Sequence, residues 1–367
     1  MRRIPYIIPV IFSSENITTL ESPTKQTEVL TDRLDRPLDS LRISVIDRCD
    51  LRCNYCMPEE EYTWLPQRDI LGFDEILRLV DVFVDLGVAR VRLTGGEPLL
   101  RGNLVELVQR LAERAGVEDL ALTTNATQLE RLALPLRRAG LQRVTVSLDS
   151  LRADRFVQLT RREALDQVLA GIGAAADVGF DELKINTVVM QDFNDDEIVP
   201  LVEFGREVGA EVRFIEYMDV GGATMWNMDE VFSKADILAR LQDHYGDVRP
   251  QGEQGTAPAQ RFALPDGTRL GVIASVTEPF CSTCDRARLT ADGLLYLCLY
   301  ASDGIDLGKC MRSGASDGEL RDIIRGAWRE RTDRSAEERL DDPYRGTLYQ
   351  VEELKQDLHR EMHTRGG

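Results

Sequence analysis

Short apolar segments alternate with amphipathic ones as far as about Asp229, and this alternation is what most limits how the chain can fold. Neighbouring parallel strands need a crossover of a dozen or more residues, which is usually a helix. The pattern therefore predicts an α/β fold, an open or closed (β/α) barrel whose parallel sheet is covered by helices. The predicted strands span residues 41–46, 91–93, 120–123, 144–148, 183–189 and 212–216.

The segment that begins at Phe73 shows the helical period most plainly. Asp74 or its neighbour is expected to start this helix and Gly87 to end it. Its apolar face, which can cover the sheet, carries Ile76, Leu77, Val80 and Phe83. In a barrel of this kind, ligands bind at the carboxyl ends of the strands. The residues that fall at those ends are Cys49, Gly96, Thr123, Ser147 and Met218.

Three cysteines follow the first predicted strand in the spacing Cys49-x3-Cys53-x2-Cys56. Thiolates favour zinc, copper(I) or iron-sulfur clusters, and a structural zinc ion takes four closed ligands. Three ligands in one short loop without a local fourth favour an iron-sulfur cluster that leaves one iron open to another molecule. A structural zinc loop is the alternative.

Two glycines follow the second predicted strand, within the run Arg92-Leu93-Thr94-Gly95-Gly96-Glu97-Pro98. Because glycine has no Cβ, such a pair lets the backbone come close to a ligand. Taken alone, the run is also an ordinary strand-to-helix turn. The nearby cysteine loop favours the ligand-binding interpretation.

A second group of cysteines, Cys281-x2-Cys284-x13-Cys298, lies beyond the alternating region. It again leaves one coordination position open. Arg286 and Arg288 follow the first pair, and at i and i+2 of an extended chain they point to the same side, where they can bind phosphate oxygens. A zinc ribbon completed by Cys310 is the competing interpretation; otherwise Cys310 is a free, small side chain.

Composition indicates a cytoplasmic enzyme. The 367 residues include 43% hydrophobic ones, enough for large cores, and the clustered, odd number of cysteines indicates a reducing compartment. The net charge of −18 argues against general nucleic-acid binding. The apolar stretch 4–12 is too short to span a bilayer and contains prolines, so residues 1–33 are predicted to be a disordered extension rather than a signal or a membrane anchor.

These motifs together resemble a known family. The first cysteine loop, with Tyr55 before its last cysteine, is similar to that of radical S-adenosylmethionine (SAM) enzymes. The second trio, the two arginines and the terminal Gly-Gly narrow the resemblance to the GTP 3',8-cyclase family of molybdenum-cofactor biosynthesis, over roughly residues 34–367. The shared motifs are LRISV, RLTGGEPLLR, LTTNA, VSLDS, RFIEYMDVGG and FCSTCDRARL. The chain departs from the family at Ile46, Asp50 and Ala126, where Thr, Asn and Gly are usual, and none of these changes removes a ligand.

The resemblance implies a partial (β/α)6 TIM-like barrel of the radical SAM type over residues 34–229. A smaller C-terminal domain with a second iron-sulfur cluster would span residues 230–345, and a tail ending in Gly-Gly would span 346–367. The activity implied is that of a lyase that converts GTP to 3',8-cyclo-7,8-dihydro-GTP, the first step of molybdenum-cofactor biosynthesis. In this reaction a 5'-deoxyadenosyl radical takes hydrogen from C3', and the sugar radical then attacks C8 of guanine.

The resemblance also implies roles for individual residues. Two four-iron four-sulfur clusters would be bound by Cys49, Cys53 and Cys56 and by Cys281, Cys284 and Cys298. SAM would contact Tyr55, Gly96, Ser147 and Met218. GTP would contact Arg42, Arg92, Thr123, Lys184, Arg286 and Arg288. The catalytic tail residues would be Gly366 and Gly367.

Physical arguments bear on some of these roles. A triphosphate brings three to four negative charges, so several cations must converge on it in an acidic protein. Lys184 stands out because the chain has few lysines, although a lysine whose stem covers apolar surface is the alternative. The terminal glycines are otherwise a frayed chain end. His359 and His363, without a third ligand nearby, are predicted to be polar surface residues.

The expected partners are GTP, an unidentified electron donor and cyclic pyranopterin monophosphate synthase, the next pathway enzyme, with a homodimer suggested by the family alone. No nucleic acid or membrane is expected. A radical SAM peptide-modifying enzyme would need more downstream cysteines than this chain has. An iron-sulfur electron carrier is the non-enzyme alternative, but it leaves the glycine loop and the arginines unexplained.

Overall fold

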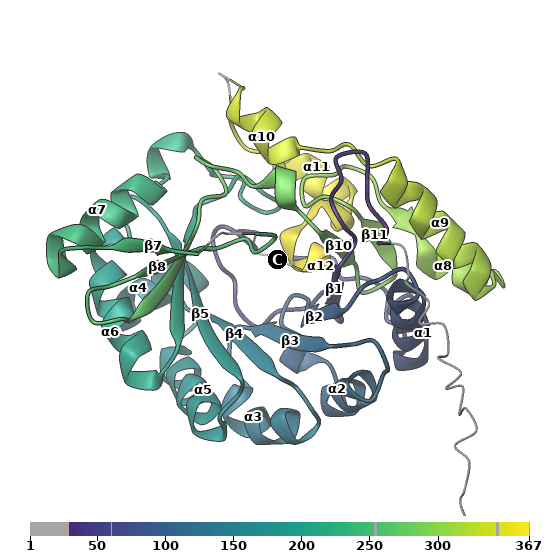
Figure 1. Ribbon diagram of the computed structural model, residues 1–367, viewed down its shortest axis with the longest axis horizontal. Helices are drawn as coiled ribbons and strands as arrows, with labels where there is room; N and C mark the ends of the chain where they lie inside the picture. The colour runs from purple at the N-terminus through teal and green to yellow at the C-terminus, as the bar shows by residue number, and fades with distance from the viewer. Residues whose placement is uncertain (1–28, 60, 253–254, 343–344, 367) are drawn as a thin grey trace, which may run out of the picture.

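The computed structural model describes residues 29–59, 61–252, 255–342 and 345–366. Within these residues twelve strands form one sheet in the order β12-β11-β10-β1-β2-β3-β4-β5-β6-β9-β8-β7. The sheet curls around a central space, and helices cover its outer face (Figure 1). Because β12 and β7 are the edges of this sheet, the described part of the chain forms an open barrel rather than a closed one.

The parallel strands predicted from the sequence form the first part of the barrel. Each pairs in parallel with the next, and each lies within two residues of its predicted range at either end. They are β1 (Ser40–Ser44), β2 (Arg90–Thr94), β3 (Asp119–Thr124), β4 (Arg143–Ser147), β5 (Glu182–Val189) and β6 (Glu211–Glu216). The predicted α/β class is therefore confirmed.

The helices of the barrel pack their apolar faces on this sheet. In α1 (Phe73–Val84) the predicted face is buried, the Glu75 side chain accepts a hydrogen bond from the Gly72 amide, and Gly87 with its positive φ follows the last turn. The others are α2 (Leu104–Ala112), α3 (Leu129–Arg138), α4 (Ala153–Thr160), α5 (Leu165–Val178), α6 (Ile198–Val208) and α7 (Lys234–Tyr245). Among the described residues no helix has the length and apolar character to cross a membrane.

The C-terminal part of the chain extends the sheet at both ends. β9 (Arg269–Ile273) pairs in parallel with β6, and β10 (Arg286–Leu289) pairs in parallel with β1. The remaining elements are β7 (Arg249–Gln251), β8 (Gln260–Ala263), β11 (Leu294–Tyr296), β12 (Ile305–Asp306), α8 (Leu307–Arg312), α9 (Asp317–Arg329), α10 (Ser335–Leu340), α11 (Val351–Gln356) and α12 (Met362–Arg365). This part is continuous with the barrel through backbone hydrogen bonds, and the domain limits expected after residues 229 and 345 remain predictions.

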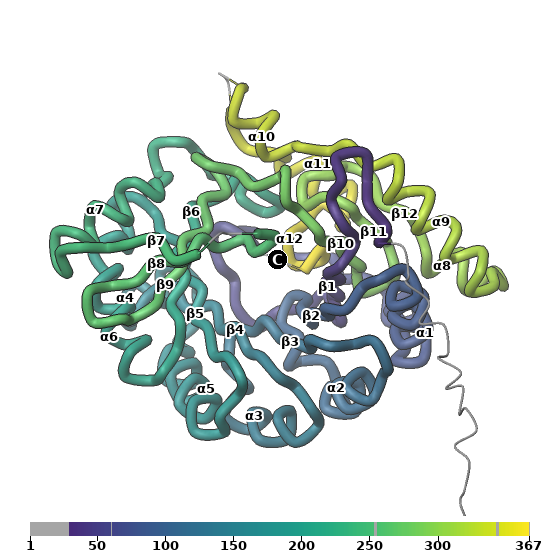
Figure 2. Tube along the Cα trace, viewed as in Figure 1, coloured from purple at the N-terminus to yellow at the C-terminus, as the bar shows by residue number. Residues whose placement is uncertain are grey.

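The predicted disordered extension needs a correction. Residues 1–28 lie outside the described residues, but residues 29–33 belong to an ordered hairpin, shown in purple near the C-terminal helices (Figure 2). Leu30 is buried and its carbonyl accepts the Leu38 amide at 2.9 Å. Asp32 is buried as well and forms an ion pair with Arg36. An apolar anchor and a buried ion pair therefore order this segment, and neither shows in its composition.

Two glycines of α5 provide a test of the helix packing. A Cβ at Gly171 would lie 2.4 Å from the carbonyl oxygen of Ala126, whereas a Cβ at Gly173 meets nothing within 4 Å. We expect Gly171→Ala to destabilise the protein by about 1–3 kcal/mol through overpacking. Gly173→Ala should stabilise it by up to about 1 kcal/mol, because alanine favours the helix. Urea denaturation of the two variants checks this, and equal shifts would contradict the packing.

Candidate active site

A cavity of about 640 Å³ occupies the interior of the barrel. It reaches from residues near the strand starts, such as Arg90 and Arg143, to the loops that follow the strand ends. Every predicted site residue except the terminal glycines lines it. The five residues expected at the carboxyl ends of the strands are all among them.

The two cysteine trios lie toward opposite ends of the strands. The first follows the carboxyl end of β1. Cys284 comes just before β10, which is parallel to β1, and Cys298 comes just after β11, which runs antiparallel to β10. The second trio is therefore at the amino ends of β10 and β1. Cys49 of the first trio thus lies at the carboxyl end where the sequence places it, whereas the second trio, which lies beyond the predicted barrel strands, is at the other end.

The first trio occupies a poor environment for free thiolates. The loop closes tightly, since the amides of Cys56 and Met57 both donate to the carbonyl of Cys53, at 3.0 and 2.7 Å. Burial, reinforced by Glu97, raises the pKa of Cys49 to about 12, and burial also raises the pKa of Cys53 and Cys56. Burial thus favours the neutral thiols, and a bound metal would have to offset this cost.

The second trio has different surroundings. Burial would raise the pKa of Cys284, but the nearby guanidinium groups of Arg286 and Arg331 outweigh it and lower this pKa to about 6. Nη2 of Arg286 lies 3.3 Å from the Cys284 sulfur. The thiolate of Cys284 is thus stabilised by positive charge, whereas burial disfavours the thiolates of the first trio.

Both trios fit a cluster better than a single ion. In the described part of the chain no three His, Cys, Asp or Glu side chains gather tightly enough to hold one metal ion. A cuboidal iron-sulfur cluster does not need that, because each of its thiolates binds a different iron. Soft thiolates on the wall of one cavity are the donor set that such a cluster requires. Cys310, in contrast, packs against the hydrophobic core from α8.

Between the trios, three arginines stand side by side across three strands. Arg42 on β1 is opposite Arg288 on β10 and Arg92 on β2. Their described partners are neutral: Arg92 donates to the Thr123 hydroxyl at 3.2 Å and Arg288 to the Gly366 carbonyl at 2.7 Å. Burial and neighbouring cations lower the pKa of Arg92 and of Arg288 to about 10. Like charges opposite one another destabilise a sheet, so this row calls for an anion.

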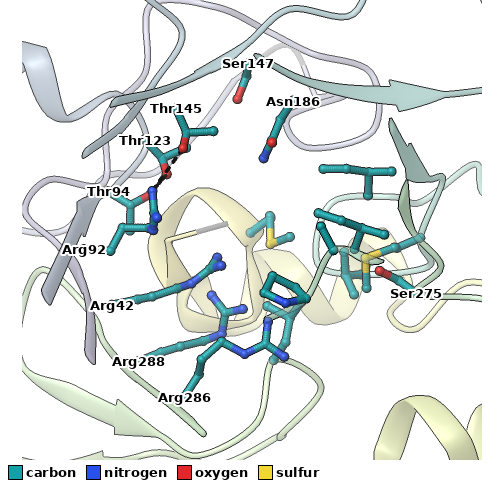
Figure 3. A pocket seen from close by; sticks show the side chains of 18 of the residues that line it. Arg42, Arg92, Thr94, Thr123, Thr145, Ser147, Asn186, Ser275, Arg286 and Arg288 are labelled. Carbon is teal, nitrogen blue, oxygen red and sulfur yellow. Dashed lines mark hydrogen bonds between the residues drawn. The ribbon is translucent and has the colours of Figure 1, made fainter. Parts of the chain in front are cut away.

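Figure 3 shows Arg42, Arg286 and Arg288 pointing into the cavity from one side, with Ser147 and Asn186 facing it from the other. Lys184 also lines the cavity, and its side chain is buried rather than spread over the surface. It forms an ion pair with Glu182. Arg213 on β6, whose role the sequence leaves open, lines the cavity and pairs with Glu211 at 2.6 Å.

Other polar groups at this site escape the sequence analysis. Asn186 is opposite Ser147 across β4 and β5, and its side-chain oxygen is buried without a partner among the described residues. Its place two residues after Lys184 on a strand was the available signal, because i and i+2 share a face. The Tyr55 hydroxyl donates to buried Asp149 at 2.7 Å. Sequence alone does not bring Asp149 to the cysteine loop, because the contact spans 94 positions.

Gly96 and Glu97 hold the loop after β2 against the first cysteine loop. A Cβ at Gly96 would lie 2.4 Å from the Arg48 carbonyl oxygen, directly before the first cysteine. Glu97, which follows, is buried and accepts hydrogen bonds from the Thr124 hydroxyl and the Asn125 amide, each at 2.7 Å. Burial nevertheless raises the pKa of Glu97 to about 7. The β2 loop is thus packed directly against the loop of the first trio.

The C-terminal tail enters the barrel (Figure 1). Gly366 is buried at a φ of +69°, where a Cβ would meet Thr94 Cγ2 at 2.4 Å. Gly367 lies outside the described residues. The prediction that His359 and His363 are surface residues is wrong: His363 is buried with its ring edge-on to Tyr62, and His359 bonds Asp292 at 2.7 Å. The histidines contact residues far away in sequence, which a local pattern cannot reveal.

Comparison with known proteins places this site in a family. Residues 43–205 match the model of the Radical SAM superfamily, and residues 210–337 match that of Molybdenum Cofactor Synthesis C. GTP 3',8-cyclase 1 of Mycobacterium tuberculosis is 51% identical over 97% of this chain and 100% of its own length. GTP 3',8-cyclase of Acidothermus cellulolyticus is 47% identical over 85% of this chain and 89% of its own. The chain belongs to the GTP 3',8-cyclase family.

A solved structure agrees on the fold alone. Streptococcus suis SuiB bound to S-adenosylmethionine aligns with a TM-score of 0.53 at 19% identity, over 84% of this chain and 71% of that chain.

Two of the chain's departures from the usual GTP 3',8-cyclase sequence have visible consequences. Asp50 accepts hydrogen bonds from the Asn125 side chain and the Thr127 hydroxyl, both at 2.7 Å, so it fixes the cysteine loop. Ala126 has a φ of +66°, the left-handed conformation that glycine adopts without cost, which explains the glycine usual there.

The ion pair of His359 makes docking of the cyclase tail pH-dependent. Burial would lower the pKa of His359, but Asp292 outweighs it and the pKa is raised. The charged pair therefore stabilises the docked tail at low pH, and this stabilisation is lost as pH rises through the raised pKa. Hydrogen exchange of residues 350–366 should show weaker protection above that pH. In the His359→Gln variant the protection of these residues should be weak at every pH. His244→Gln, at an exposed histidine, should match the wild type; pH-independent protection in the wild type would contradict this role.

Proposed function

We propose that this chain is a radical SAM lyase that converts GTP to 3',8-cyclo-7,8-dihydro-GTP, the first step of molybdenum-cofactor biosynthesis. The observation that carries the proposal is the arrangement of the cavity: two cysteine trios toward opposite ends, with a row of like-charged arginines between them. SAM and a triphosphate can both bind there, each beside its own trio. Family membership at 51% identity over nearly the whole chain agrees with this reaction.

The first trio, Cys49, Cys53 and Cys56, would hold a four-iron four-sulfur cluster with SAM at its open iron. When bound, that cluster would supply the electron that cleaves SAM to methionine and a 5'-deoxyadenosyl radical. This radical would take hydrogen from C3' of GTP, and the cyclised radical formed when the sugar attacks C8 would be reduced by one electron from the donor and one proton. The chain's own task is to orient SAM. Gly96 lets the loop after β2 pack directly against the loop of the first trio, because a Cβ there would meet the Arg48 carbonyl oxygen. The residues proposed to contact SAM are Tyr55, Gly96, Ser147 and Met218.

The arginine row would neutralise the triphosphate. Guanidinium groups bind phosphate oxygens through paired N–H donors, and burial strengthens this attraction. The residues proposed to contact GTP are Arg42, Arg92, Thr123, Lys184, Arg286 and Arg288. Cys281, Cys284 and Cys298 would hold the second four-iron four-sulfur cluster, next to the arginines of β10. For hydrogen transfer from C3', a guanine placed there would need its ribose directed toward the SAM end.

The proposed setting is the cytoplasm, where thiols remain reduced. An unidentified donor would supply electrons, the product would pass to cyclic pyranopterin monophosphate synthase, and a homodimer is the proposed assembly. The acidity of the chain supports the absence of nucleic-acid partners.

An anaerobic assay tests the function directly. Reconstituted protein is incubated with SAM, GTP and dithionite, and 5'-deoxyadenosine and the cyclised nucleotide are followed by mass spectrometry. We expect both to appear together, and Cys53→Ser to abolish both while Cys310→Ser retains them. 5'-deoxyadenosine without any change in GTP would remove the substrate assignment. Neither product from a protein with intact clusters would favour the electron carrier.

Lys184 predicts a pH dependence of GTP binding. Burial, reinforced by Arg213, lowers the pKa of Lys184 to about 8 despite its pairing with Glu182. A bound phosphate raises this pKa again, so affinity should fall as pH rises above about 8, by at most roughly tenfold per pH unit for one linked proton. Lys184→Arg should remove this dependence, and Lys309→Arg, at an exposed site, should keep it. Anaerobic calorimetry between pH 7 and 9 measures both; a flat wild-type profile would exclude Lys184 from the site.

The terminal glycines are proposed to act in turnover. An alanine at position 366 requires the left-handed backbone and meets Thr94, so the chain end would be displaced from its place beside Thr94 and Arg288. We expect Gly366→Ala combined with Gly367→Ala to retain iron for two clusters but to lose product formation. Gly326→Ala, on an open face of α9, is the control. Unchanged product formation in the double variant would remove the tail from the mechanism.

A further inference from the structure

Two buried arginines outside all the recognised motifs border the second trio. Nη1 of Arg36, on the N-terminal hairpin, donates to the carbonyl of Cys281 at 2.9 Å. Nη1 of Arg331, which follows α9, donates to the carbonyl of Cys284 at 2.9 Å. Both side chains are only 1% exposed. Segments about 300 residues apart therefore hold the backbone of two of the three cysteines in place.

One carboxylate fixes the orientation of both arginines. Asp32 Oδ2 lies 2.5 Å from Nε of Arg36 and 3.6 Å from Nη1 of Arg331. Nη1 of Arg36 donates in addition to the Asp333 carbonyl, at 2.8 Å. A buried guanidinium is tolerated only with such partners. Nε and Nη1 of Arg36 are thus accounted for by contacts within the protein.

The remaining nitrogen of Arg36 differs from these two in its contacts. Its Nη2 is buried and has no hydrogen-bond partner among the described residues. Arg36 nevertheless lines the cavity together with Cys281, Cys284 and Cys298. A buried donor on a charged group is costly when it lacks an acceptor, and a group bound in the cavity that Arg36 lines could supply one. The cluster proposed for this trio supplies sulfide acceptors at that wall.

We propose that Arg36 is a positioning residue for the second iron-sulfur cluster. Its Nη2 donates a hydrogen bond to a sulfide of that cluster. This inference rests on the proposed assignment of Cys281, Cys284 and Cys298 as cluster ligands. N–H donors and positive charge next to a cluster stabilise the added electron, and so raise the reduction potential. Arg36 thereby makes the second cluster easier to reduce than it would be with a neutral residue in its place.

The test measures the reduction potential of the second cluster by itself. The full-length parent carries Cys49→Ala, Cys53→Ala and Cys56→Ala, so the reduced cluster seen by electron paramagnetic resonance is the second one. The protein is reconstituted and titrated anaerobically with dithionite, without GTP. Arg36→Met and Arg36→Lys should both move the midpoint potential to more negative values with unchanged iron content. Lysine can keep the charge next to Asp32 but lacks the second nitrogen of the fork.

Arg33→Met is the matched control. Arg33 lies on the same hairpin but is exposed and pairs with exposed Glu330, so its loss should leave the potential unchanged. If Arg36→Met does not retain iron, the lysine variant decides. If Arg36→Lys keeps the reduction potential of the parent, the inference is overturned. This holds also if the variant binds GTP more weakly at an unchanged potential, because Nη2 would then serve the substrate. A parent that binds no iron would instead overturn the ligand assignment, and the inference with it.

Discussion

The site depends on the parallel pairing of β1 with β2 on one side and with β10 on the other. β1 leads into the first cysteine loop, and β10 begins just after Cys281 and Cys284 of the second trio. Pairing two strands that lie almost 250 residues apart sets both trios at the wall of one cavity. The same register places Arg42 between Arg92 and Arg288, so one set of backbone hydrogen bonds positions the two cysteine trios and the cations together.

The row of arginines is unfavourable for folding and useful for binding. Three cations that line the cavity from adjacent strands repel one another. Elsewhere in the barrel the cations are compensated by carboxylates: Lys184 pairs with Glu182, and Arg213 pairs with Glu211. Among the described residues the arginine row lacks such carboxylate partners, so an anionic ligand that binds there would relieve the repulsion between the arginines. This relief would contribute to the binding free energy. The overall acidity of the chain does not prevent this, because exposed charges are screened over about 8 Å at physiological ionic strength.

The two trios differ in electrostatic character. Carboxylates such as Glu97 and Asp149 surround the first trio, whereas Arg286 and Arg331 lie beside the second. Nearby negative charge disfavours adding an electron to a cluster, and positive charge favours it. The barrel thus offers two dissimilar environments: one suited to a strongly reducing centre beside SAM, the other to a centre that is easier to reduce.

The alternation of strands and helices determined the α/β class and the strand positions, because periodicity and crossover length are local properties. Ligand spacing within each cysteine trio is equally local, as is the shared face of Arg286 and Arg288. Tertiary structure decided which distant segments meet. It ordered the hairpin around Asp32 and Arg36, buried His363 against Tyr62, and brought Asn186 to face the cavity. These contacts are made between residues far apart in the chain, and their stability comes from burial, which no local pattern of residues encodes.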